Sequence, residues 1–292
     1  MAVTWTTESD RTVARAKGSP TPYGTLAMAW FERNGVHLYY ERRGSGPSLM
    51  FISGTGADLR IPPSGFDYAF ADRRDTICFD QRGLGRSDQP KGPYSMADYA
   101  DDAAYLLDTL EISSGFVVGV SFGGMVAQEL ALRHPDRVER LVLCCTSSGG
   151  AGGSSYPLHL LPEQNLSFEE RLAITDVRWA DPSFVDPLRD EALARLVSPA
   201  SPSEGAKLQL GARSLHDTYD RLDKIRCPVL VAGGRYDGQA PPDNARVLAE
   251  RIPDARLEFF EGGHPFLRQD PRAVSVVSAF LDEEPLEVHT NG

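Results

Sequence analysis

The sequence has few cysteines, no long apolar runs and no excess of positive charge. Its 292 residues include 4 cysteines, and 30 Lys and Arg stand against 41 Asp and Glu, for a formal net charge of −11 at pH 7. An acidic protein repels phosphate backbones and anionic lipids, which argues against nucleic acid as a partner. The longest apolar runs, such as residues 116–120, fall far short of the roughly 20 residues that cross a bilayer, so no membrane span is predicted.

Signals for export and for metal binding are also missing. Residues 1–26 contain no apolar block of the signal-peptide type, and they are predicted to form an N-terminal extension of a cytoplasmic protein. The four cysteines (Cys78, Cys144, Cys145 and Cys227) lie in or beside strand-like runs and are expected to be reduced thiols. No C-x-x-C or H-x-x-x-H spacing accompanies them, so no metal site is predicted.

Strand-like and helix-like segments alternate along the chain. Asn34-Gly35 is a strong turn signal and predicts a hairpin of strands 27–32 and 36–42. Further strands are predicted at 49–52, 76–79, 116–120, 140–145, 228–232 and 257–260, and helices at 95–110, 125–132, 244–251 and 273–281. Strands separated by helices pair in parallel through right-handed crossovers. The predicted fold class is therefore α/β, with a mostly parallel central sheet flanked by helices.

The interval between the sixth and seventh predicted strands is much longer than one crossover needs. Apolar residues recur there among charged ones, as in short amphipathic helices. We expect a helical lid at 147–219, inserted after the sixth strand into a core of residues 27–146 and 220–292. A separate second domain is the alternative. The Gly- and Ser-rich run 147–155 is interpreted as a hinge that lets the lid move.

Residues 119–124, with the sequence GVSFGG, follow a predicted strand and precede a predicted helix. The pattern G-x-S-x-G in this context is typical of a nucleophile elbow, in which glycines let the chain turn sharply and project the serine hydroxyl above the sheet. The motif alone also fits an ordinary glycine-rich turn. Ser121 is therefore a candidate nucleophile whose assignment depends on partners further along the chain.

A serine nucleophile needs a general base and a third group that orients the base. His264 follows the last predicted strand, between two glycines and a proline, in a loop that can reach the edge of the sheet. Asp237 follows the strand at 228–232 and is the candidate carboxylate. The other histidines are expected to be structural or solvated (His37, His134, His289) or to line a pocket (His159, His216).

Attack on a carbonyl produces an oxyanion, which needs backbone N–H donors. Phe122, directly after the nucleophile, and Thr55, in the glycine-rich loop after the third strand, are the candidate donors. Asp80 is expected to shape its own loop. Trp179, Phe184 and His159 are the candidate substrate-pocket residues, because bulky side chains of the predicted lid either face the site or pack the lid on the sheet.

With these motifs the chain resembles α/β-hydrolase fold enzymes of the lid-bearing esterase, lactonase and haloperoxidase-like group. The resemblance covers about residues 27–282, and the motifs that carry it stand at 80–87, 119–124, 234–237 and 262–264. The order Ser121, Asp237, His264 is that of the family's triad. One departure is Ser53-Gly54, where the family often has His-Gly. Epoxide hydrolases and dehalogenases of this family use Asp at the elbow, so Ser121 argues against both activities.

The resemblance implies a cofactor-free serine hydrolase that cleaves an ester or lactone of a small to medium, largely apolar molecule through an acyl-enzyme on Ser121. The same triad also serves carbon–carbon bond hydrolases, perhydrolases and lyases, which stay open as alternatives. A small-molecule receptor on the same fold is the alternative outside enzymes. The expected partner is a small-molecule substrate, and assembly into a homodimer stays open.

Overall fold

A single sheet of nine strands lies at the centre of this computed structural model, which describes residues 19–21, 24–197 and 202–283. The strand order is β1-β2-β3-β5-β4-β6-β7-β8-β9. The strands are β1 (Ser19–Thr21), β2 (Gly24–Arg33), β3 (Val36–Gly44), β4 (Ser48–Ile52), β5 (Asp75–Phe79), β6 (Gly115–Val120), β7 (Val138–Cys144), β8 (Val229–Gly234) and β9 (Ala255–Phe260).

The strands from β5 to β9 pair in parallel, while β1, β2 and β3 add antiparallel pairs at one edge. The predicted α/β class with a mostly parallel sheet is confirmed. The predicted extension 1–26 is wrong at its end, because Ser19–Thr21 pairs with β2 and β2 itself begins at Gly24. These two strands are held by backbone hydrogen bonds, and the polar composition of the segment did not indicate them. Residues 1–18 and His289 lie outside the described residues.

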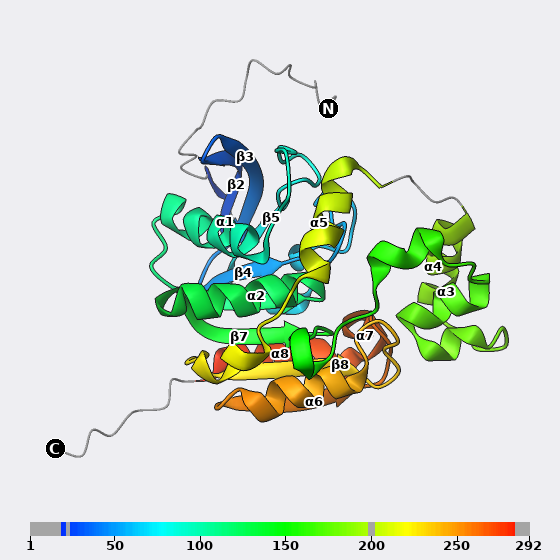
Figure 1. Ribbon diagram of the computed structural model, residues 1–292. Coiled ribbons are helices and arrows are strands. Elements are labelled where there is room, and N and C mark those ends of the chain that lie inside the picture. The colour runs from blue at the N-terminus through cyan, green and yellow to red at the C-terminus, as the bar shows by residue number, and fades with distance from the viewer. Residues whose placement is uncertain (1–18, 22–23, 198–201, 284–292) are drawn as a thin grey trace.

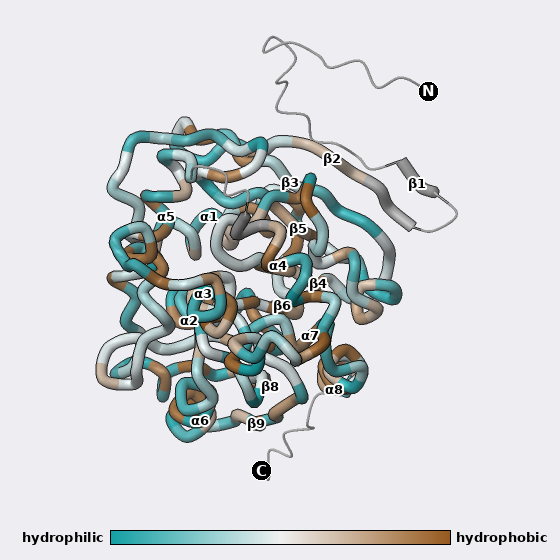
Figure 2. Tube along the Cα trace, turned by 90° about the vertical axis from the view of Figure 1, so that its right-hand side faces the viewer, coloured by the Kyte–Doolittle hydropathy of each residue, from teal (hydrophilic) through white to brown (hydrophobic). Residues whose placement is uncertain are grey.

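Helices cover both faces of the sheet, in the three-layer arrangement seen in Figure 1. They are α1 (Met96–Thr109), α2 (Phe122–Arg133), α3 (Phe168–Thr175), α4 (Pro187–Val197), α5 (Glu204–Ser214), α6 (Pro242–Arg251), α7 (Phe266–Gln269) and α8 (Pro271–Asp282). Ser95 caps α1, where the sequence predicted a helix start, through a capping box with Asp98. The hydropathy colours in Figure 2 alternate along α6 and α8, as expected of helices with one face on the sheet.

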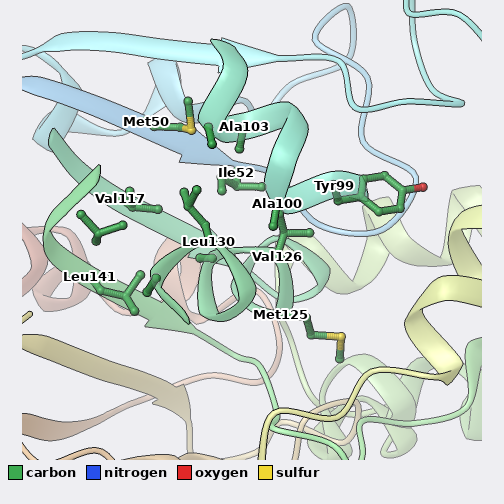
Figure 3. Packing of buried hydrophobic residues seen from close by; sticks show 14 of the residues in the cluster. Met50, Ile52, Tyr99, Ala100, Ala103, Val117, Met125, Val126, Leu130 and Leu141 are labelled. Atoms are coloured by element: carbon green, nitrogen blue, oxygen red, sulfur yellow. The ribbon is translucent and has the colours of Figure 1, made fainter. Parts of the chain in front are cut away.

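Two hydrophobic clusters lie on opposite faces of the sheet because side chains alternate along a strand. In β4, Met50 and Ile52 join the cluster that contains α1, α2 and α6, whereas Leu49 and Phe51 join the cluster that contains α8. Figure 3 shows the first cluster, in which Ile52 lies with Ala100 and other residues of α1 and α2. Strands buried on both faces hold a rigid sheet, whose carboxyl edge carries the loops of interest.

The chain between β7 and β8 contains α3, α4, α5 and short 3-10 turns, and this helical segment is called the insert. Its role as a lid stays a prediction. The interpretation of residues 147–155 as a hinge is wrong. Ser147 and Ser148 are fully buried, the Ser147 and Ser155 hydroxyls are 3.0 Å apart, and Thr218 N–H donates to the Ser148 carbonyl at 2.8 Å. Small side chains serve close packing here rather than freedom of motion.

The four cysteines are free thiols, as predicted, and Cys78, Cys144 and Cys145 are buried. Burial raises the pKa of the Cys227 thiol to about 11, so it is protonated at neutral pH. In the part of the chain that the structure describes, no helix has both the length and the apolar character needed to span a bilayer.

Candidate active site

Ser121 lies at the turn between β6 and α2, at the carboxyl edge of the sheet. Its backbone has φ 56° and ψ −116°, a strained conformation for a residue with a side chain. Gly123 makes the turn possible, since a Cβ there would collide with the carbonyl oxygen of Ile52 in β4. Ser121 N–H donates to the Cys144 carbonyl at 2.8 Å, and the Thr146 hydroxyl donates to the Ser121 carbonyl at 2.8 Å. The elbow is thus fixed from two neighbouring strands.

Asp237 and His264 come together from the loops after β8 and β9. The His264 Nδ1 atom lies 2.8 Å from Asp237 Oδ2. Asp237 is buried, and its Oδ1 accepts the backbone N–H groups of Gln239 and Ala240, both at 2.8 Å. A carboxylate held in this way accepts a hydrogen bond from the Nδ1–H group, so the proton of a neutral His264 stays on Nδ1 and Nε2 is the acceptor.

The side chain of Gln239 lies between the histidine and the serine. Its Nε2 atom is 2.8 Å from His264 Nε2 and 3.3 Å from Ser121 Oγ. Because His264 Nε2 is an acceptor, the Gln239 amide donates to it and also to the Ser121 oxygen. Ser121 and His264, both among the described residues, make no direct hydrogen bond to each other. The amide therefore occupies the path along which a proton would pass from serine to histidine.

The insert contacts the His264 loop directly. His264 N–H donates to the carbonyl of Thr175, at the end of α3, at 2.7 Å, and Val177 N–H donates to the Tyr236 carbonyl at 2.9 Å. At Gly263 a Cβ would collide with the same Thr175 carbonyl, so the close approach of α3 requires glycine there. The end of α3 thereby fixes the loops that carry His264 and Asp237.

The loop after β4 lies beside Ser121. A Cβ added at Gly54 would lie 3.4 Å from the Ser121 Cβ atom, and Gln81 Nε2 donates to the Ser53 carbonyl at 2.8 Å. The two predicted donors lie on either side of this contact: Phe122 is the first residue of α2, whose N–H has no acceptor within the helix, and Thr55 follows Gly54. Their role as donors to an oxyanion stays a prediction. This geometry is compatible with an oxyanion hole formed by the two N–H groups.

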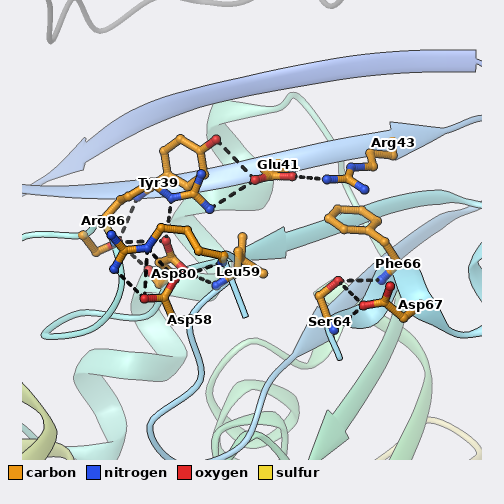
Figure 4. Close-up of polar contacts among 12 residues, drawn as sticks. Tyr39, Glu41, Arg43, Asp58, Leu59, Ser64, Phe66, Asp67, Asp80 and Arg86 are labelled. Atoms are coloured by element: carbon orange, nitrogen blue, oxygen red, sulfur yellow. Dashed lines mark hydrogen bonds and ion pairs between the residues drawn. The ribbon is translucent and has the colours of Figure 1, made fainter. Parts of the chain in front are cut away.

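Asp80 shapes its loop, as predicted. Its carboxylate accepts the Leu59 N–H at 2.7 Å, and both the N–H and the Nε of Arg86 at 3.0 and 3.1 Å (Figure 4). The Nη2 group of Arg86 also donates a hydrogen bond to Glu41 Oε1 at 3.1 Å. All these bonds run within the loops after β4 and β5 or to β3, so Asp80 supports the loop that follows β4 and takes no direct part in the triad.

Among the described residues, the fold brings together one group of possible metal ligands that residue spacing did not predict. Donor atoms of Cys145, Asp237 and His264 lie within 4.8 Å of one another. Burial and the nearby Asp237 carboxylate raise the pKa of the Cys145 thiol well above its ordinary value, which disfavours the thiolate that a metal ion requires. Since the Asp237 and His264 atoms are already paired, this set fits a metal ion poorly.

The three predicted pocket residues lie in three different environments. Trp179 is buried, and its indole N–H donates to Asp186 at 3.0 Å, which indicates packing within the insert. Phe184 lines a shallow surface pocket beside Arg178, whose guanidinium carbon is 4.7 Å from the ring centre. Of the three, His159 is exposed and lines a partly open cavity, which is also lined by His216, the other histidine named as a possible pocket residue.

Sequence reasoning missed two side chains near the triad. Gln239 stands two residues after Asp237, and no motif marks it. Gln209, in α5, is fully buried, and its Oε1 accepts the Gly56 N–H at 2.8 Å. The polar sequence of α5 gave no sign that one face of this helix is buried against the loop after β4.

Comparisons with known proteins bear on the family and the fold. The profile of the alpha/beta hydrolase fold family matches residues 47–173. The 3-oxoadipate enol-lactonase 2 of Acinetobacter baylyi is 31% identical over 244 residues, covering 82% of this chain and 90% of that protein. The 2-hydroxymuconate semialdehyde hydrolase of Pseudomonas putida is 31% identical over 255 residues, covering 82% and 89%. Among solved structures, the enol-lactonase from Burkholderia xenovorans superposes with a TM-score of 0.69 at 28% identity, covering 87% of this chain and 100% of that one.

Proposed function

The chain belongs to the α/β-hydrolase fold family, and on that premise we propose that it is a serine hydrolase that cleaves an ester or lactone of a small to medium, largely apolar molecule. The observation that carries the proposal is the Asp237–His264 pair, 2.8 Å apart, beside a serine in a strained strand-to-helix turn. Strain at a buried turn is retained where a fold needs the side chain in that position. A receptor would need neither the strain nor the pair.

The mechanism follows from the order of these groups. Ser121 Oγ attacks the carbonyl carbon while its proton passes to His264 Nε2, and the N–H groups of Phe122 and Thr55 donate to the oxyanion. His264 then gives the proton to the alcohol oxygen, whose bond to carbon breaks, leaving an ester on Ser121. Water attacks this ester as His264 takes its proton. The acid leaves, and Ser121 recovers its hydrogen.

Gln239 must withdraw before the first proton transfer. Its amide donates to both the base and the nucleophile in the free protein, at 2.8 and 3.3 Å. A substrate carbonyl placed over Ser121 offers the amide an alternative acceptor. Substrate entry would therefore replace one hydrogen-bonded arrangement with another and bring Ser121 and His264 into direct contact.

Lactones are included in the proposed substrate class because the Acinetobacter baylyi and Burkholderia xenovorans relatives are named enol-lactonases. Ring opening needs the same steps, with the leaving alcohol kept on the acyl chain. The Pseudomonas putida relative is named a hydrolase of a semialdehyde, so the bond cleaved is the point on which the alternatives differ.

A fluorophosphonate probe tests the nucleophile, and a panel of p-nitrophenyl esters and simple lactones tests the reaction. We expect one adduct, on Ser121, and hydrolysis of at least one ester or lactone. Ser121→Ala should abolish both, while Ser113→Ala, at an exposed serine outside the site, should change neither.

Two results would count against the proposal in different ways. A folded protein whose Ser121 is not labelled would point to the small-molecule receptor. Labelling of Ser121 without cleavage of any ester or lactone would point to one of the alternative activities, namely carbon–carbon bond hydrolase, perhydrolase or lyase.

A further inference from the structure

A cavity of about 170 Å³ lies between the first turn of α2, helix α5 and the segment 147–159. Met125, Ser147, Ser155, His159, Arg213 and His216 are among the residues that line it. Met125 stands one helical turn after Ser121, and its N–H lies 3.3 Å from the Ser121 carbonyl. The cavity therefore adjoins the helix that begins at the candidate nucleophile.

Helix α5 connects this cavity to the loop after β4. Gln209 and Arg213 are four residues apart, so they share one face of the helix, and both are buried. Gln209 binds the Gly56 N–H, while Arg213 Nη1 donates to the Tyr156 carbonyl at 2.7 Å. Tyr156 N–H in turn donates to the Gln239 carbonyl at 2.6 Å. A short chain of contacts thus links Arg213 to the triad.

Arg213 differs from the other buried arginines. Arg74, Arg82 and Arg140 each pair with a carboxylate, on Asp282, Asp102 and Glu283 respectively. Arg213 is 5% exposed, and its Nε and Nη2 atoms have no hydrogen-bond partner among the described residues. Burial alone lowers its pKa to about 10, so it is still a cation at neutral pH. A buried, unpaired cation is costly to a fold unless a ligand pairs with it.

The two unused nitrogens define the shape of the missing partner. Nε–H and Nη2–H lie along one edge of the guanidinium plane, and two parallel donors match the two oxygens of a carboxylate. His216 adds no second charge, because burial lowers its pKa to about 4 and its Nε2–H donates to the Ser147 carbonyl at 3.2 Å. One cation beside neutral groups suits a single carboxylate better than a phosphate dianion.

We infer that this cavity is a subsite for a carboxylate carried on the acyl part of the substrate, with Arg213 as its partner. The inference rests on the proposed function and narrows its substrate class to esters or lactones with an anionic acyl chain. The acyl group stays attached to Ser121 after the first step, and the cavity adjoins the helix that Ser121 begins. The unpartnered Nδ1 of His216 is an acceptor for a hydroxyl on the same chain.

Matched p-nitrophenyl esters test the subsite. Monoesters of succinate, glutarate and adipate carry a terminal carboxylate, and alkanoate esters with the same number of chain atoms do not. We expect at least one monoester to exceed its neutral counterpart in kcat/KM by about 10- to 100-fold, the usual effect of a charged hydrogen bond. Arg213→Met should remove this preference, mainly through KM, and Arg213→Lys, which keeps the charge without the paired donors, should restore only part of it.

Controls separate the subsite from the fold and from the chemistry. Arg213→Met removes a buried unpaired charge, so its melting temperature should not fall, and labelling of its Ser121 by the fluorophosphonate probe should show that the site is still assembled. Arg246→Met, at an exposed arginine of α6, should leave the preference for the monoesters unchanged. Free glutarate should inhibit the wild type competitively and the Arg213→Met variant at least 10-fold more weakly, whereas inorganic phosphate should inhibit neither.

The outcomes are distinguishable. Normal labelling of Ser121 with equal rates for charged and neutral esters would overturn the carboxylate subsite and leave the hydrolase standing. Equal inhibition by glutarate and phosphate would overturn the choice of a carboxylate. Failure of Ser121 to react with the probe in folded protein would overturn the proposed function itself.

Discussion

Two groups of polar residues near the candidate nucleophile differ in how fully they are hydrogen-bonded. The first, called the triad wall, contains Asp237 and His264, and the second, called the α5 wall, contains Gln209 and Arg213. On the triad wall, the Asp237 carboxylate accepts hydrogen bonds from Gln239, Ala240 and His264, so each of its oxygens is occupied. On the α5 wall, Gln209 Nε2 and two nitrogens of Arg213 have no partner among the described residues. Both walls are buried, yet only the first has its hydrogen-bonding groups satisfied within the protein.

On the proposed function and the inferred subsite, this difference separates groups fixed for chemistry from groups left for recognition. A general base works when its orientation is set before substrate arrives, which needs a satisfied network. A binding wall gains affinity from groups that find partners only in the complex. Substitution of the carboxylate that orients the base should therefore cost activity, whereas substitutions on the second wall should alter which substrate is preferred.

The largest effect in this comparison is expected from Asp237→Asn. The Asn oxygen would keep the two backbone N–H groups that Oδ1 now accepts, so its NH2 group would face His264 Nδ1. Nδ1 would then become an acceptor and Nε2 would carry the proton, leaving no base for Ser121. We expect kcat/KM for the best ester to fall roughly 1,000- to 10,000-fold, measured with the melting temperature.

Asp243→Asn is the matched control, because Asp243 is an exposed carboxylate on α6 that pairs with Arg246 at the surface. It should retain full activity. If Asp237→Asn lost less than 10-fold in kcat/KM while remaining folded, Asp237 would not orient the base, and the contrast between the walls would disappear.

A smaller effect is expected from Gln239→Leu, which removes the amide between Ser121 and His264. The side chain must leave before proton transfer, and a typical net hydrogen bond contributes about 1 kcal/mol. Its loss should therefore speed the reaction of Ser121 with a small fluorophosphonate about 5-fold. The second-order rate constant of labelling measures this directly.

Gln239→Glu gives the opposite test at the same position. The introduced carboxylate would accept a hydrogen bond from His264 and stabilise its protonated form, so labelling at neutral pH should slow. If Gln239→Leu instead slowed the labelling of Ser121, the amide would assist the transition state, and Gln239 would act together with the triad wall.

The triad wall was predictable from the sequence because its signals are local. A strand, a glycine-rich turn and a helix place Ser121, and the loops after two later strands place Asp237 and His264, since parallel strands bring their carboxyl ends to one edge. The boundaries of α1 were predictable for the same reason: Ser95 and Asp98 cap it from within four residues.

The α5 wall was not predictable, because the burial and the hydrogen bonds of its residues depend on contacts with segments distant in sequence. Gln209 meets Gly56 across 153 positions, and nothing in the pattern of α5 indicates this. The run 147–155 misled for a related reason: its composition is that of a flexible linker, but Ser147 and Ser155 bind each other, and Gly149 forms a bridge with Asp217. A Gly- and Ser-rich composition indicates high conformational entropy of the free chain, but tertiary contacts fix this segment in the folded protein.

The smallest effect is expected from Phe184→Ala, which tests whether substrate contacts the outer part of the insert. Phe184 is half-buried in a surface pocket whose lining includes Arg178 and Gln269 but neither Ser121 nor His264. Loss of its contact with the Arg178 guanidinium should lower the free energy of unfolding by about 1 kcal/mol. The ratio of kcat/KM values along a series of acyl chain lengths should stay within about twofold of wild type, because the truncated ring touches no substrate. A changed chain-length profile at an unchanged melting temperature would show that substrate reaches this pocket, and the binding wall would then extend from α5 across the insert.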